Sequence, residues 1–230
     1  MAKTFDEVMR TLRSLGTESR WRLNLKNGAG SNQFGVGFGQ LRTLAKDITT
    51  DHAMGMKLWE TGNIDAMLLA SMILDATLLP KEQAEKMAAP LTYSPLIDEF
   101  AFSALAKAPY QEQLILKWIY SPAATLGRIG WNLLVDVISE KKPLPLPIDE
   151  ILSHIENKMK EAAKPKQEAM NHCLCEIGIR MPEYTERCIA IGMKLGRLDD
   201  RPIPKGCTSS YAPEWIAAGI KLREKQKGYT

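Results

Sequence analysis

The residues best suited to holding a metal lie close together near the C-terminal end. His172, Cys173 and Cys175 stand within four residues of one another, and imidazole and thiolate groups are zinc ligands. On a helix, however, Cys173 and Cys175 point about 200° apart, and no second close pair completes the four ligands of a structural zinc site. We therefore expect no metal here and interpret these cysteines as buried free thiols.

A glycine-rich segment is the second candidate for chemistry. Residues 24–39 read NLKNGAGSNQFGVGFG and contain five glycines. The G-x-G spacing is typical of phosphate-binding loops, but those loops need a preceding strand and a βαβ unit. Neither is indicated here, so we expect an extended loop that leads into a helix beginning at Phe38.

The elements that position these residues are predicted to be helices throughout. Apolar residues recur at intervals of three and four, whereas alternation with period two is nearly absent. Pro95, Pro122, Pro147, Pro165 and Pro182 fall near helix starts, where a missing backbone N–H costs least. The predicted helices span residues 5–15, 38–48, 52–60, 64–76, 81–89, 95–106, 110–120, 123–138, 147–163, 165–179, 182–195 and 212–225.

Short connections between these helices predict antiparallel neighbours. Helices of similar character begin near Ile64, Ser94, Ala123 and Pro165, within the spacing of helical-hairpin repeats. We expect an all-α, HEAT-like helical-repeat solenoid of about six antiparallel helix pairs, in which stacking buries the apolar stripes. A compact helical bundle is the alternative.

Composition limits the location and the domain count. The 230 residues are 45% hydrophobic, and 30 Lys and Arg against 27 Asp and Glu give a mild charge of +3. Four cysteines without disulfide-scaffold spacing favour a reducing compartment, and no signal peptide or membrane span is indicated. We expect a cytoplasmic monomer with one domain, residues 1–230. Residues 201–230 would form a C-terminal cap in which Tyr211 and Trp215 cover the end of the stack.

Several segments carry a family resemblance. FGVGFGQLRTLAKDI, LWETGNIDAMLLASMILD, PLIDEF, LGRIGWNLL and GCTSSYAPEWI together resemble the DNA alkylation repair family, helical-repeat proteins related to the bacterial AlkD-type DNA glycosylases. The likeness covers residues 33–215, and WETGNIDAMLLAS is its most specific part. It implies a concave, basic face that binds duplex DNA around an alkylated purine, without a metal or an organic cofactor.

The resemblance also implies a catalytic carboxylate. Alkylation at N3 or N7 makes a purine cationic and a good leaving group. A carboxylate beside the deoxyribose then stabilises the developing positive charge and accepts a proton from water. Asp98 of SPLIDEF matches this group, and Arg128 of LGRIGWNLL matches a companion that would hold a phosphate through its planar fork.

The sequence departs from the pattern of active members at two aromatic positions. Ser94 stands four residues before Asp98 where they have an aromatic ring, and the neighbouring Tyr93, which we expect to be exposed, is a partial substitute. Ile179 aligns with a second tryptophan of those members. The predicted DNA-binding residues are Arg128, Tyr93, Ser94, Arg42, Lys46 and Arg180.

Structural interpretations stand beside these functional ones. Asp98 is expected in the first turn of its helix, where the helix dipole stabilises a carboxylate whether or not that carboxylate is catalytic. Arg128 lies among apolar residues and could pair with Asp136 or another acid. Trp59, Trp118 and Trp131 have the spacing of core residues. Two functions follow, a glycosylase for alkylated purines or a non-catalytic module that binds DNA or a protein on the same face.

Overall fold

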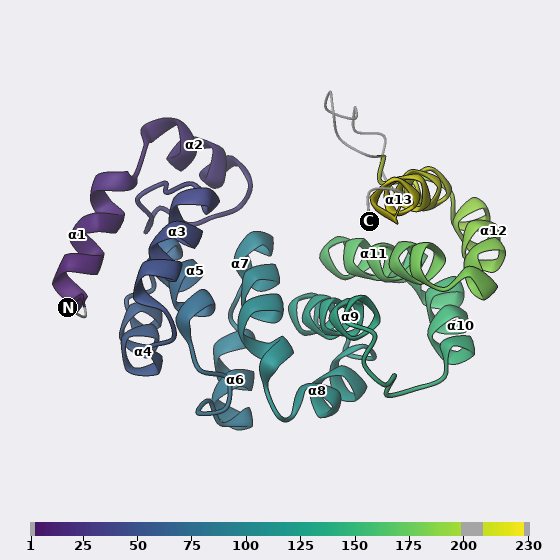
Figure 1. The fold of residues 1–230 in the computed structure, drawn as a ribbon, viewed down its shortest axis with the longest axis horizontal. Coiled ribbons are helices and arrows are strands. Elements are labelled where there is room, and N and C mark those ends of the chain that lie inside the picture. The colour runs from purple at the N-terminus through teal and green to yellow at the C-terminus, as the bar shows by residue number, and fades with distance from the viewer. Residues whose placement is uncertain (1–2, 199–208, 228–230) are drawn as a thin grey trace. The chain divides into compact units, whose positions relative to one another are not determined.

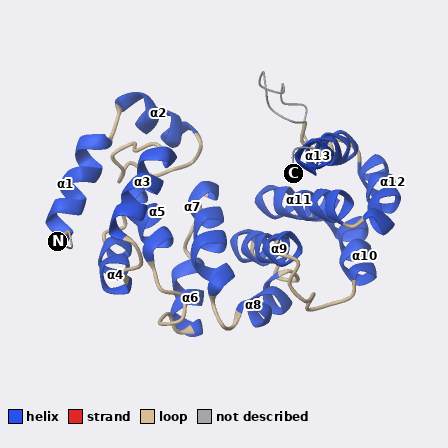
Figure 2. Cartoon of the chain, viewed as in Figure 1, coloured by secondary structure: helices blue, strands red, loops and turns tan. Residues whose placement is uncertain are grey.

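The computed structural model describes residues 3–198 and 209–227, and within them every regular element is helical (Figure 2). These ranges contain thirteen α-helices and no strand (Figure 1). The prediction of an all-α chain is confirmed. Residues 201–208 of the predicted C-terminal cap lie outside the described residues. No helix within the described ranges is both long enough and apolar enough to cross a membrane.

The chain divides into two compact units, Met1–Gln111 and Glu112–Thr230. The helices of the first unit are α1 (Phe5–Leu15), α2 (Glu18–Lys26), α3 (Phe38–Ile48), α4 (His52–Glu60), α5 (Ile64–Ile73), α6 (Lys81–Ala88) and α7 (Ser94–Glu99).

Helix α5 is the centre of the first unit, where it packs against α3, α4 and α7. Asn63 begins the helix by accepting hydrogen bonds from the backbone N–H groups of Asp65 and Ala66, which lack partners within the helix. Gly62 precedes it at φ +63°, a conformation that glycine adopts without strain. This tight turn folds α5 back along α4, as the short connection predicts.

Helix α2 was not predicted, because its apolar residues do not gather on one face. Thr17 caps it with a side-chain oxygen that accepts from the Arg20 N–H. The predicted loop at residues 24–39 is consequently shorter at its beginning, since its first three residues belong to α2. The prediction that it leads into a helix at Phe38 is confirmed.

The helix predicted at residues 95–106 is not continuous. Helix α7 ends at Glu99, a π-helical turn follows at Phe100–Ala104, and a 3-10 turn follows at Leu105–Lys107. Single π-turns are uncommon and occur frequently at functional sites. The Phe100 ring is tilted against Trp59 with centroids 4.7 Å apart, and Phe100 is fully buried.

The helices of the second unit are α8 (Gln111–Trp118), which begins at the boundary, α9 (Ala124–Ser139), α10 (Ile148–Lys158), α11 (Lys164–Arg180), α12 (Thr185–Leu195) and α13 (Ala212–Lys227). Helix α11 packs against α9 on one side and α13 on the other, while α12 contacts α11 and α13 (Figure 1). Trp118 and Trp131 are buried in this unit, as expected of core residues.

Helices α9 and α11 run parallel. Arg128 near the start of α9 donates to the Pro165 carbonyl at the start of α11, and Arg180 at the end of α11 donates to the Ser139 carbonyl at the end of α9. Parallel alignment of alternate helices is what a stack of antiparallel pairs requires. At the other side of α11, Trp215 of α13 stacks on His172 with centroids 5.4 Å apart, so α13 packs against α11.

Candidate functional site

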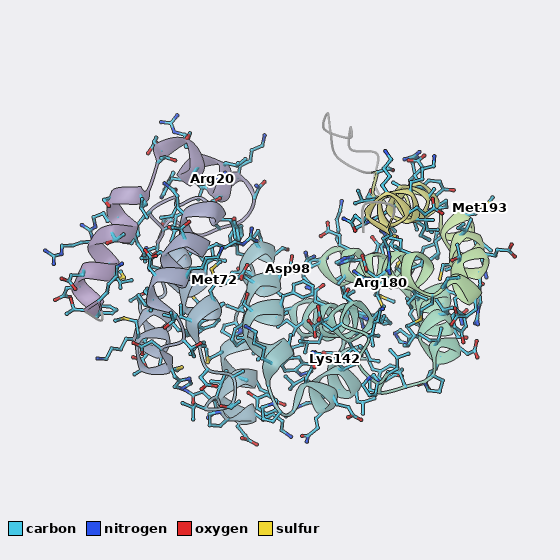
Figure 3. All side chains as sticks on the ribbon, viewed as in Figure 1. Arg20, Met72, Asp98, Lys142, Arg180 and Met193 are labelled. Carbon is cyan, nitrogen blue, oxygen red and sulfur yellow. The ribbon has the colours of Figure 1, made fainter. Side chains whose placement is uncertain are left out.

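Asp98 lies on α7 in the first unit, half-buried, one residue before the helix ends (Figure 3). The expectation that it occupies the first turn is wrong, because α7 begins at Ser94 and its first turn holds no acidic residue. Favourable interaction with the helix N-terminus fades within one turn. The dipole therefore does not explain Asp98, which stands two residues before the π-helical turn.

Tyr93 was expected to be exposed, and this is wrong, since only 4% of it is accessible. Tyr93 is the residue before α7, so the helical periodicity of α7 does not determine whether its side chain is exposed. Burial raises the pKa of the Tyr93 phenol, the negative charge of Asp65 raises it further, and the positive charge of Arg20 lowers it. Tyr93 is a core residue of the first unit rather than a ring presented to DNA.

Asp65 was missed in the sequence, although it lies inside WETGNIDAMLLAS. It is completely buried and accepts backbone N–H bonds from three consecutive residues, Phe34, Gly35 and Val36, at 2.5, 2.9 and 3.0 Å. A buried carboxylate is tolerated when backbone donors satisfy it in this way. Asp65 thus fixes the glycine-rich loop and, through it, the start of α3.

Arg20 was also missed, and it lines an open cavity of about 290 Å³ in the first unit. The cavity lies between the N-terminal ends of α2 and α3, and Arg20 is exposed on α2 (Figure 3). Its described lining contains hydroxyl, amide and guanidinium groups but no Asp or Glu. The lining residues are Thr17, Ser19, Arg20, Leu23, Gly37 and Gln40. A guanidinium and two helix N-termini suit a phosphate group.

The other predicted DNA-binding residues of the first unit lie on separate helices. Arg42 and Lys46 are exposed on α3, and the Arg42 guanidinium stands 5.6 Å from the centre of the Phe38 ring. Ser94 is half-buried at the start of α7. Helix α5 packs against both α3 and α7, so these residues come from two helices that share α5 as a neighbour.

Arg128, in the second unit, is nearly buried, with 9% of the residue accessible. Its Nη1 donates to the Pro165 carbonyl at 2.9 Å and to a carboxylate oxygen of Glu168 at 2.9 Å. Asp136, the acid considered as its partner, pairs instead with Lys142 at 2.7 Å. The positive charge of Arg128 is therefore compensated within the unit, as the structural interpretation anticipates.

Lys166 reinforces the same junction between α9 and α11. Its Nζ donates to the Ser121 carbonyl at 2.9 Å, and burial lowers its pKa. The lysine stem lies so close to Gly127 that a Cβ there would stand 2.5 Å from the Lys166 Cδ. Lys166 is thus buried, whereas the neighbouring Lys158, Lys160 and Lys164 are exposed.

Ile179 and Arg180 lie at the far end of α11 from Arg128. Eleven residues separate Glu168, the partner of Arg128, from Ile179, which corresponds to about 16 Å along a helix. Arg180, which is labelled on α11 in Figure 3, pairs through Nε with Glu176 of its own helix. The structure therefore does not bring Ile179 or Arg180 together with Arg128.

The cysteines behave as the sequence predicts. Cys173, Cys175 and Cys188 are free and buried, and burial raises the pKa of each thiol, that of Cys188 to about 12. Cys207 lies outside the described residues. Within the described ranges, no group of three His, Cys, Asp or Glu side chains is placed to hold a metal ion.

Comparison with known proteins identifies relatives along the whole fold. The family described as DNA alkylation repair enzyme matches residues 8–216. An uncharacterized protein of Listeria innocua is 22% identical over 228 residues, which are 96% of this chain and 98% of that protein. An uncharacterized protein of Listeria monocytogenes is 22% identical over 231 residues, covering 97% and 99%.

One solved structure shares the fold closely. It is described as a new family of proteins related to the HEAT-like repeat DNA glycosylases with affinity for branched DNA structures. The TM-score is 0.84 at 23% sequence identity, and the match covers 96% of this chain and 95% of that one. The fold is therefore the HEAT-like helical repeat that the sequence predicts.

Proposed function

Because the chain belongs to the DNA alkylation repair enzyme family, we propose that it is a DNA-repair protein that binds DNA through the sugar-phosphate backbone and prefers branched or distorted duplexes. Affinity for branched DNA is described for the solved relative. Backbone contacts supply most of the affinity of such binding and need no base-specific groups.

The observation that carries this proposal is the Arg20 cavity in the first unit. Arg20 is the one charged residue in its described lining, which residues from the starts of α2 and α3 complete. Arg42 and Lys46 add exposed positive charge on α3, one and two turns beyond its start. These groups suit successive phosphates of a strand rather than one damaged base.

Binding is favoured over hydrolysis by the state of Arg128. A glycosylase of the kind implied by the resemblance needs an arginine that can grip a phosphate, and Arg128 is committed to Glu168 and to the Pro165 carbonyl. Freeing Arg128 for a phosphate would cost its ion pair with Glu168 and its hydrogen bond to the Pro165 carbonyl. Ser94 supplies no aromatic wall beside Asp98 either.

The direct test is fluorescence anisotropy with a four-way DNA junction and with a linear duplex of the same sequence and length. We expect tighter binding of the junction. Arg20→Gln should weaken binding of both and lower the slope of log affinity against log salt by about 1, as for one lost phosphate contact.

Arg22→Gln is the matched control, since Arg22 lies on the same helix, is equally basic, and already pairs with Glu18 at 2.7 Å. It should change the affinity much less. Absence of binding to both DNA forms would overturn the proposed function. Equal affinity for junction and duplex would contradict the proposed preference for branched DNA. Unchanged DNA affinity of Arg20→Gln would contradict the role of the cavity in binding.

Hydrolysis of the N-glycosidic bond of N3- or N7-alkylated purines is the second candidate, and the position of Asp98 favours it. This carboxylate lies beside a π-helical turn, outside the reach of the helix N-terminus. Release of free purine from methylated duplex DNA should be measured for the wild type, for Asp98→Asn and for Glu99→Gln. Release lost only in Asp98→Asn would establish this reaction.

A further inference from the structure

A second cavity, of about 290 Å³, lies in the second unit at the end of α11 that is remote from Arg128. It is formed by the end of α11, the turn that follows it, the start of α12 and the last part of α13. Its apolar walls are Ile179, Pro182 and Ile220, and its polar walls are Arg180, Thr185, Arg223 and Glu224. A cavity of this size holds a small organic ligand.

Arg223 is the unusual member of this lining. Its Nη1 is buried and has no hydrogen-bond partner within the described ranges, and no ion pair joins Arg223 to another described residue. A buried guanidinium N–H without an acceptor is costly, and such groups in folded proteins generally have a function or an external partner. An acceptor that enters the cavity would satisfy it.

The neighbouring charges leave Arg223 as the uncompensated one. Arg180 is neutralised by Glu176, which it contacts through Nε, and also donates to the Ser139 carbonyl at 3.3 Å. Glu224 is exposed, so water screens its charge. One half-buried positive charge therefore faces a cavity whose other walls are half apolar and half polar. This arrangement suits a ligand with one anionic group and a body that has both apolar and polar parts.

The walls are held rigidly before any ligand arrives. Gly219 lets α13 approach α11 closely, because a Cβ there would lie 2.4 Å from the Ile179 Cδ1. Thr185 Oγ1 donates to the Gly178 carbonyl at 2.7 Å and fixes the start of α12 against α11. Preformed walls reduce the entropy lost when a ligand binds.

We propose that this cavity binds a nucleotide, with the phosphate on the guanidinium fork of Arg223 and the sugar or base against Ile179 and Ile220. Arginine matches phosphate because its planar donors bond two oxygens at once. The nucleotide is either free or part of a DNA strand. In the second case the inference rests on the proposed function and gives the second unit a backbone contact of its own.

The test begins with a probe that does not require DNA binding. Adenosine 5′-monophosphate and adenosine are titrated into the full chain, and binding is followed by calorimetry. We expect saturable binding of the monophosphate and at least about tenfold weaker binding of adenosine, since one charge-assisted pair is lost. Arg223→Gln should weaken monophosphate binding by a similar factor and leave adenosine binding unchanged.

Lys225→Gln is the control, because Lys225 is an exposed cation on the same helix, outside the cavity lining. Its binding should equal that of the wild type. Arg223→Gln should fold, since it removes an unpaired buried charge, and its thermal unfolding midpoint verifies this. The inference would be overturned if adenosine and the monophosphate bound with equal affinity, or if Arg223→Gln bound the monophosphate as tightly as the wild type does.

The source of the nucleotide is distinguished with the four-way junction. If Arg223→Gln weakens junction binding and Lys225→Gln does not, the cavity takes a phosphate of the strand. If Arg223→Gln weakens binding of the monophosphate but not of the junction, the ligand is a free nucleotide. If the wild type binds no DNA but its binding of the monophosphate still depends on Arg223, the proposed function is overturned and the nucleotide site is not.

Discussion

Arg128 of α9 and Glu168 of α11 form a 2.9 Å ion pair that joins two parallel helices of the second unit. The arginine side chain is 11% accessible and the glutamate side chain 39%. The same Nη1 also donates to the Pro165 carbonyl in the first turn of α11. The pair therefore joins the start of α9 to the start of α11. Arg128, to which the resemblance assigns a phosphate, thus has a structural role here.

Glu168→Gln tests this tie. The substitution keeps the shape of the side chain but removes its charge, so we expect the free energy of unfolding to fall by about 1–2 kcal/mol, a value reduced for the partial exposure of Glu168. Urea denaturation measures the change. Glu161→Gln is the control, because Glu161 makes an exposed pair with Lys158 at 3.3 Å. A stable Glu168→Gln protein with tighter DNA binding would instead show that the pair restrains a phosphate-binding arginine.

Asp65→Asn should destabilise the first unit. The three backbone donors of residues 34–36 converge on this carboxylate, and an amide cannot accept all three without turning its own N–H₂ toward one of them. We expect a loss of about 3 kcal/mol, because bonds to a buried charge are replaced by an unsatisfied donor. Asp47→Asn, at an exposed residue 3.7 Å from Lys3, should change stability by less than about 0.5 kcal/mol. Equal effects of the two changes on the urea midpoint would contradict this role of Asp65.

The sequence predicts what depends on local periodicity and on capping. Helices with a continuous apolar stripe, such as α3, begin and end where predicted, and Trp118 and Trp131 are buried as expected. Helix α2 is missed because its apolar residues do not form a stripe. The π-helical turn after Asp98 is missed because the same residues would continue an α-helix equally well.

The candidate site was predicted less completely, because it depends on contacts between distant residues. Glu168 follows Arg128 by forty residues, and nothing local indicates that the two side chains pair. Tyr93 was placed wrongly because the residue before a helix can turn either way, and here it lies in the core. Arg20 was missed because no helix was predicted between residues 15 and 38, although Thr17 before Glu18 and Ser19 is a signature of a helix start.

Gly130→Ala should destabilise the second unit through close helix packing. A Cβ at this position would lie 2.7 Å from the Ile119 N and 2.8 Å from the Trp118 carbonyl carbon, both backbone atoms that cannot move aside. We expect a loss of about 1–3 kcal/mol in unfolding free energy from overpacking. Gly39→Ala is the control, since a Cβ at the exposed Gly39 meets nothing within 4 Å. A thermal midpoint unchanged in Gly130→Ala would show that α8 and α9 can separate without cost.

His154 should make stability depend on pH near neutrality. Its ring lies between Tyr120 and Trp131, with centroids 5.1 and 5.7 Å away. Burial lowers the pKa of His154, and the positive charges of Lys166 and Lys158 lower it further, while Glu150 raises it. Its Nε2 is buried without a partner among the described residues, so an added proton there would find no acceptor.

The sign of the dependence follows from the lowered pKa. Above the ordinary histidine pKa of about 6.5, both states are neutral and the full contribution to stability is present. As the pH falls from there through the lower pKa of the folded state, the unfolded chain binds the proton first, and stability is lost. Carboxylates with lowered pKa values do not interfere, because they titrate at lower pH; they are Glu7, Asp75, Glu156 and Glu214.

The measurement compares urea midpoints of the wild type and His154→Gln at about pH 7.5 and about pH 5.5, which bracket the ordinary histidine pKa. We expect the wild type to lose more stability on acidification than the variant, because glutamine does not titrate. His52→Gln is the control, since His52 is partly exposed and bonds through Nδ1 to the Asp75 carbonyl at 3.1 Å in the first unit. It should retain the wild-type pH dependence. If His154→Gln shows the same loss as the wild type, the proton is taken up elsewhere, and the packing of His154 against Trp131 does not oppose its protonation.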